Sequence, residues 1–218
     1  MPPALPPRQE SAFAALREFA RKRTVLERCE MCSRELPGEH EHLVEPVSKL
    51  ICACDACAIL FEGQSGTKYK RVPRRVLFLR NFQLSDAQWD GLMVPIEMAF
   101  FYKSTPQAKV IALYPSPAGP TESLLSLDTW TDIVEMNLIL NEMEPDVSAL
   151  LVNRVGHVRG AAPAEYYLVP IDECYKLVGL IRTHWRGLSG GTEVWRAIGA
   201  FFAALKQRAG FGGEDAHA

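Results

Sequence analysis

The chain has 218 residues, of which 48% are hydrophobic and 23% charged, and its formal net charge is −2. These values are typical of a soluble globular protein, and without an excess of positive charge they argue against a nucleic-acid partner. The opening residues, MPPALPPRQES, place prolines where a secretion signal needs an apolar run. No uninterrupted apolar stretch approaches the ~20 residues of a membrane span, so we expect a cytoplasmic protein without one.

The length favours two structural units, because it exceeds the common size of a single domain. Residues 1–10 are rich in proline and are expected to be disordered. From Ser11 to Arg23 the apolar residues recur at helical spacing, which predicts a short helix with a solvated basic face. We assign this helix and the cysteine-rich stretch that follows it to a first unit, residues 11–67.

The stretch from residue 29 to residue 57 contains five of the six cysteines of the chain. Two C-x-x-C turns, Cys29 with Cys32 and Cys54 with Cys57, are separated by 21 residues. This separation lies just beyond the usual range for four-thiolate zinc sites. Two such turns, joined by a hairpin, complete a tetrahedron around one ion, which predicts a small module of the zinc-ribbon or rubredoxin type. In the cytoplasm, clustered cysteines favour a metal over disulfides.

One thiol of the cluster is spare, and we expect Cys52 to lie outside the ligand set and to point away from the ion. Cys52, His40 and His42 remain possible substitutes for one of the four ligands. The two histidines are flanked by glutamates, which is typical of solvated side chains. Zinc is the preferred cofactor, with iron or an iron–sulfur cluster as the alternative, because four thiolates suit all of them.

Residues 68–75, KYKRVPRR, carry five positive charges and are interpreted as a basic connector. A solvated linker is the simpler interpretation, and a docking site for an acidic partner is the alternative.

Residues 76–209 are predicted to form an α+β docking domain. Segments of strand character occur at 76–79, 96–102, 109–114, 147–155 and 165–169. The second and third are joined by a loop too short for a parallel crossover, so the sheet should be mainly antiparallel. The proline-rich stretch 115–120 is expected to end this strand pair.

The sequence of the same domain also contains signals for helices. Ser85 and Gln88 form a capping box for a short helix, and Asp128 is a plausible N-cap for a helix that ends near Leu140. Two amphipathic helices close the chain and should pack as a pair on one face of the sheet. Residues 210–218 are expected to form a flexible tail.

No motif for catalysis stands out, since the sequence has no G-x-S-x-G, P-loop or H-E-x-x-H pattern. Cys174 lies on the apolar stripe of its predicted helix, which favours a buried structural thiol over a nucleophile. No catalytic or cofactor-binding residue is therefore assigned outside the metal module.

Several segments together carry a resemblance to a known family: CEMC, HEHLVE, CACDACAILF, WDGLMVPIEMAFFY, YPSPAGPTES, PDVSALLVNR and VPIDECYKLVGLIRTHWRGLSGGTEVW. Over residues 11–208 the chain resembles an uncharacterised bacterial family encoded in gene clusters for actinobacterial-type, oxygen-tolerant nickel–iron uptake hydrogenases. The resemblance implies a hydrogenase subunit or an assembly factor as the partner, and it supplies no activity.

The favoured function is that of a metal-binding accessory or assembly protein of such a hydrogenase system, acting by protein–protein binding. The alternative is a rubredoxin-like iron electron-transfer protein that serves the same system. A catalytic role is the least favoured, because four thiolates leave no position for a substrate.

Overall fold

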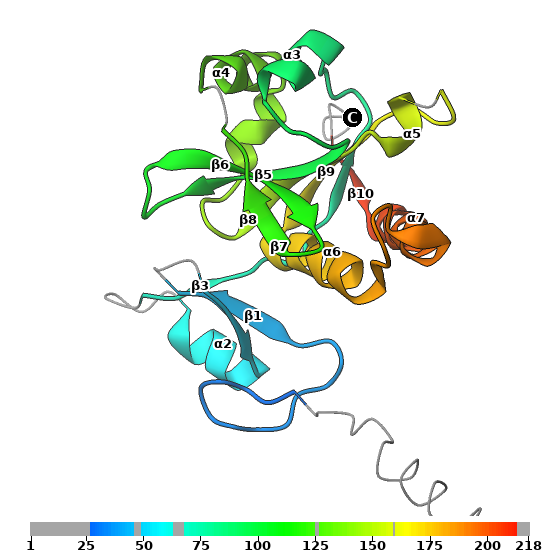
Figure 1. Ribbon diagram of the computed structural model, residues 1–218. Coiled ribbons are helices and arrows are strands. Elements are labelled where there is room, and N and C mark those ends of the chain that lie inside the picture. The colour runs from blue at the N-terminus through cyan, green and yellow to red at the C-terminus, as the bar shows by residue number, and fades with distance from the viewer. Residues whose placement is uncertain (1–26, 46–48, 63–67, 125–126, 159, 213–218) are drawn as a thin grey trace, which may run out of the picture.

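The computed structural model describes residues 27–45, 49–62, 68–124, 127–158 and 160–212. The predicted disordered segment and the predicted first helix lie outside these ranges. Figure 1 shows a small sheet with one helix below a larger sheet that has helices on both of its faces. The α+β class, with a four-cysteine group and an antiparallel sheet domain that ends in helices, is confirmed.

The small module is built on a three-stranded antiparallel sheet with the order β2-β1-β3. Its elements are β1 (Glu41–Val44), β2 (Leu50–Ala53), α2 (Asp55–Phe61) and β3 (Lys70–Arg71). Leu43 and Ile51 point to one side of the sheet and are buried with the site cysteines. The alternation of a strand sends His42 and Cys52 to the other side.

The large sheet has seven strands in the order β10-β4-β9-β8-β5-β6-β7. All neighbours are antiparallel except β10 and β4, which run parallel. The strands are β4 (Leu77–Leu79), β5 (Met98–Ser104), β6 (Lys109–Ser116), β7 (Gly119–Glu122), β8 (Ser148–Asn153), β9 (Glu165–Pro170) and β10 (Gly210–Gly212).

Helices cover both faces of this sheet. The predicted C-terminal pair, α6 (Ile171–His184) and α7 (Gly191–Arg208), packs on one face. The other face is covered by α3 (Asp86–Gly91), α4 (Leu127–Met136) and the 3-10 helix η1 (Leu138–Glu142), and the short α5 (Val155–Val158) follows β8. Phe100 and Phe101 of β5 are both fully buried, one in each apolar cluster, as expected of a strand covered on both sides.

Of the two predicted helix starts, the structure confirms one and contradicts the other. The capping box is formed, with Ser85 Oγ accepting from Gln88 N and Gln88 Oε1 accepting from Ser85 N. The helix expected to run to about Leu140 ends at Met136, and its start at Leu127 places Asp128 inside the first turn, so the N-cap assignment was wrong.

Three segments gain strands that the sequence did not indicate. The proline-rich stretch continues as the hairpin β6–β7, in which Pro120 lies on the edge strand and tolerates the missing N–H. The expected tail begins with β10, which pairs with β4. The basic connector contains β3, which pairs with Leu43 and Val44 of β1.

The small module lies against the helix-pair side of the large domain, with β1 close to α6 (Figure 1). Val44 and Val72 are buried in the apolar cluster of the large domain. Polar contacts join the same surfaces, because Lys70 Nζ is 2.6 Å from Asp146 Oδ2 and His42 Nδ1 is 3.2 Å from Asp172 Oδ2. The module is therefore anchored to the domain rather than tethered by a free linker.

Candidate metal centre

The first cysteine pair lies on a tight turn between Arg28 and Glu35, which form an isolated antiparallel bridge. Cys29 N donates to Arg34 O at 2.8 Å, and Ser33 N donates to Cys29 O at 2.7 Å. Ser33 has a φ of 63°, the left-handed conformation that lets the chain reverse within these few residues. The turn presents both thiols of the pair, with Cys29 buried and Cys32 exposed.

The second pair lies at the start of a helix and not on a turn between strands. Cys54 follows β2 directly and is the N-cap of α2, and Cys57 lies in the first turn. Residues three apart share one side of a helix, so the two thiols face the same way. The second pair was expected on a tight turn and instead lies at a helix start, while β1 and β2 form the hairpin that was expected to join the two pairs.

The four sulfur atoms of Cys29, Cys32, Cys54 and Cys57 all lie within 4.8 Å of one another. The sulfurs of Cys32 and Cys54 are 3.7 Å apart. Four sulfurs placed tetrahedrally at ~2.3 Å from one ion stand about 3.8 Å apart, so the group matches the size of a tetrathiolate site. Three of the four cysteines are buried in the module core. The residues therefore fit a tightly held metal ion.

Hydrogen bonds at the turn prepare one thiol for metal binding. Burial raises the pKa of Cys29, but backbone N–H groups of Cys54, Cys32 and Met31 outweigh it and lower the pKa to about 6. Burial and the neighbouring thiols raise the pKa of Cys57 to about 12. Without a cation, the surroundings thus favour the thiolate form of Cys29 and the protonated form of Cys57. A bound cation stabilises the thiolate form of a cysteine ligand.

Cys52, His40 and His42 are not part of this group. They form a second group of three, whose ligand atoms also lie within 4.8 Å of one another. Cys52 lies on β2 two residues before Cys54. The alternation of a strand places its side chain on the other face of the small sheet from Ile51 and Ala53, and Cys52 still packs against the module core. The structure thus separates the three proposed substitutes from the four preferred ligands.

The chain matches the model of a family of unknown function, DUF5947, over residues 28–209. The chain belongs to this family. The match covers the cysteine module and the large domain together, so both are part of the DUF5947 unit. No curated protein and no solved structure matches the chain. Membership in the DUF5947 family does not bear on hydrogenases, and the resemblance to proteins from hydrogenase gene clusters stays a prediction.

The basic segment 68–75 is held mainly by ion pairs within the molecule. Arg71 Nε is 2.8 Å from the buried carboxylate of Glu41, and Arg74 pairs with the same carboxylate. The hydrogen bond from Arg71 is the main reason that the pKa of Glu41 is lowered. Because these cations already have acidic partners, they are less suited to attract an external one than the sequence suggested.

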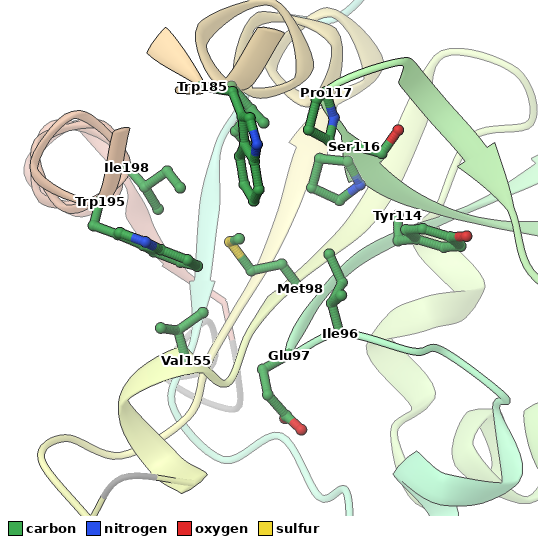
Figure 2. A pocket seen from close by; sticks show the side chains of 12 residues that line it. Ile96, Glu97, Met98, Tyr114, Ser116, Pro117, Val155, Trp185, Trp195 and Ile198 are labelled. Atoms are coloured by element: carbon green, nitrogen blue, oxygen red, sulfur yellow. The ribbon is translucent and has the colours of Figure 1, made fainter. Parts of the chain in front are cut away.

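The large domain has an apolar pocket of about 350 Å³ between the sheet and the helix pair. Figure 2 shows the rings of Trp185, at the end of α6, and Trp195, near the start of α7, next to the Met98 side chain. Tyr114 and Pro117 of the β6–β7 hairpin lie on the opposite wall. The lining suits an apolar side chain. The pocket could not be predicted from the sequence, since its residues are brought together only by tertiary packing.

The sixth cysteine, Cys174, lies apart from the four-cysteine group. Cys174 is fully buried, and burial raises its pKa well above that of a free thiol, so it is a poor nucleophile. No helix in the described part of the chain is both long and apolar enough to cross a membrane.

Proposed function

We propose that this protein is a zinc-binding accessory protein that acts by binding another protein in the cytoplasm. The observation that carries the proposal is the four-thiolate group, Cys29, Cys32, Cys54 and Cys57, whose sulfurs lie within 4.8 Å of one another. A site closed by four protein ligands has no position for a substrate, which is typical of structural zinc. The ion would stabilise the module in its place against the large domain.

We further propose that the partner is a subunit, or the precursor of a subunit, of a nickel–iron hydrogenase during its assembly. The resemblance of segments from both units to proteins of hydrogenase gene clusters supports this choice. The module is held against the large domain by ion pairs, and the large domain has an apolar pocket that a side chain of a partner protein could enter.

The test is a pull-down with tagged protein from cells that express the hydrogenase genes. We expect wild type and Cys174→Ala to recover a hydrogenase subunit and Cys57→Ser to recover none, because only the last change removes a metal ligand. Recovery of no subunit by wild type, together with normal hydrogenase activity in a strain lacking the protein, would refute the assembly role.

One observation favours the alternative, a rubredoxin-like iron protein for electron transfer. Cys32 is exposed, which would bring a thiolate ligand of the ion to the molecular surface. Four thiolates are a suitable ligand set for iron as well as for zinc, and only the iron form is coloured. Visible absorption from aerobically purified protein, with iron in equal amount to the chain, would favour this alternative over zinc.

A further inference from the structure

His40, His42 and Cys52 form a group of possible ligands that is separate from the four-cysteine group. His42 and Cys52 are directly opposite each other on β1 and β2. His40 precedes β1 by one residue, and its ring centroid is 4.7 Å from that of His42. One ligand atom from each of the three residues lies within 4.8 Å of the others.

The His40 side chain is almost fully buried, including one of its ring nitrogens. Its side chain is 5% exposed, and Nδ1 lies 3.1 Å from the carbonyl oxygen of Pro37. Nε2 is buried and has no hydrogen-bond partner among the described residues. Burying an unsatisfied polar group is unfavourable, and coordination of a metal ion is one way to satisfy an imidazole nitrogen.

His42 is oriented in the way that is common for metal-binding histidines. Its Nδ1 lies 3.2 Å from the Asp172 carboxylate at the start of α6, and both side chains are mostly buried. A carboxylate that accepts a hydrogen bond from one ring nitrogen fixes the tautomer and makes the other nitrogen a better ligand. This contact leaves Nε2 of His42 for the group and places the group at the junction of the two structural units.

The charges near the group also suit a cation. Two neutral imidazoles and one thiolate leave a divalent ion with a net charge of +1. The Asp172 carboxylate is in contact with His42, and Glu27 Oε2 lies 3.6 Å from His40 Nδ1. Mixed imidazole and thiolate ligands suit zinc and its late first-row neighbours rather than magnesium or calcium.

We propose that His40, His42 and Cys52 form a second metal site, separate from the four-cysteine site, that binds zinc or a similar divalent transition-metal ion. Three protein ligands leave the fourth position of a tetrahedron for water or for a group of a partner molecule. The first ion stabilises the module, and the second lies where the module meets α6. The second site does not depend on the proposed hydrogenase partner.

The test counts zinc in full-length protein that has been loaded with zinc and freed of the excess. The variants are His40→Asn, His42→Asn and Cys52→Ser. Asparagine carries an N–H near the position of imidazole Nδ1, so the contacts with Pro37 or Asp172 are kept while Nε2 is removed. His157→Asn is the matched control, because His157 lies on α5 and belongs to neither cysteine-containing group.

We expect two zinc ions per chain in wild type and in the control, and one in each of the three variants. Zinc K-edge absorption should report about 2.5 sulfur ligands per zinc in wild type and four in the variants, because the first site has four thiolates and the second has one. Circular dichroism should show the variants folded.

One zinc per chain in wild type, unchanged by the variants, would overturn the second site. Loss of all zinc from folded His40→Asn and Cys52→Ser would overturn it as well, because it would assign these residues to the first site. Failure of the hydrogenase pull-down leaves the zinc count unaffected, so the two proposals fail separately.

Discussion

Replacing Cys57 with serine tests whether a metal ion holds the small module together. Of the eight buried residues in the module core, three are cysteines of the site. The remaining apolar side chains, such as Leu43 and Ile51, each contribute about 1.5–3 kcal/mol by burial. Structural zinc contributes about 10–16 kcal/mol to the folding of zinc-finger peptides. Loss of the ion therefore removes more free energy than these few side chains supply.

The large domain should survive the same change, since two apolar clusters of 22 and 15 buried residues are found among its described residues, and only Val44 and Val72 come from the module and the connector. We therefore expect Cys57→Ser to unfold the module locally, across β1, β2 and α2, and to leave β8 and β9 intact.

Amide hydrogen exchange measures this difference directly. In Cys57→Ser the amides of β1 and β2 should exchange as in an unfolded chain, while those of β8 and β9 keep the protection seen in wild type. Cys174→Ala is the matched control, because it removes a buried thiol outside the site. Unchanged protection of β1 and β2 in Cys57→Ser would refute the structural role of the metal.

Two further predictions concern the large domain. Cys174→Ala should lower the free energy of unfolding by about 1 kcal/mol through lost packing and leave the metal content unchanged, and a larger loss of partner binding than of stability would contradict a purely structural thiol. Burial raises the pKa of Asp146, but hydrogen bonds from Lys70 and Thr105 outweigh it, so the pKa in the folded protein is lowered. The ionised carboxylate therefore stabilises the fold at pH values above the pKa of the unfolded chain, ~3.9. This stabilisation is lost as the pH falls through the lower pKa of the folded protein. Asp146→Asn should therefore cost about 1 kcal/mol at pH 7 in denaturant melts, since Lys70 is partly exposed, and a cost that persists undiminished below pH 3 would contradict this reasoning.

The four-cysteine group was predictable because a C-x-x-C pair is a local feature whose meaning depends on few other residues. The helix α2, whose N-cap is Cys54, was less predictable, since its sequence DACAILF is short and mostly apolar and suits a strand or a helix equally well. In the large domain, the predicted strands and the final helix pair were found because their periodicity extends over many residues.

Features that depend on partners far apart in sequence could not be predicted. Phe100 and Phe101 are buried on opposite faces of the sheet, so helices must cover both faces. Two adjacent phenylalanines in the sequence do not reveal which elements cover them. The ion pair of Arg71 with Glu41 requires the pairing of β1 and β3. His42 and Cys52 lie opposite each other only in one register of β1 and β2. The sequence shows the H-x-H pattern and a spare cysteine, but it does not show this register.

The most direct test of the central claim is zinc K-edge absorption on the His40→Asn variant, which isolates the four-cysteine site. We expect one zinc per chain with four sulfur ligands at ~2.3 Å, supplied by Cys29, Cys32, Cys54 and Cys57. A protein without bound metal, one with iron in equal amount to the chain, or a zinc ion with fewer than four sulfur ligands would contradict the claim.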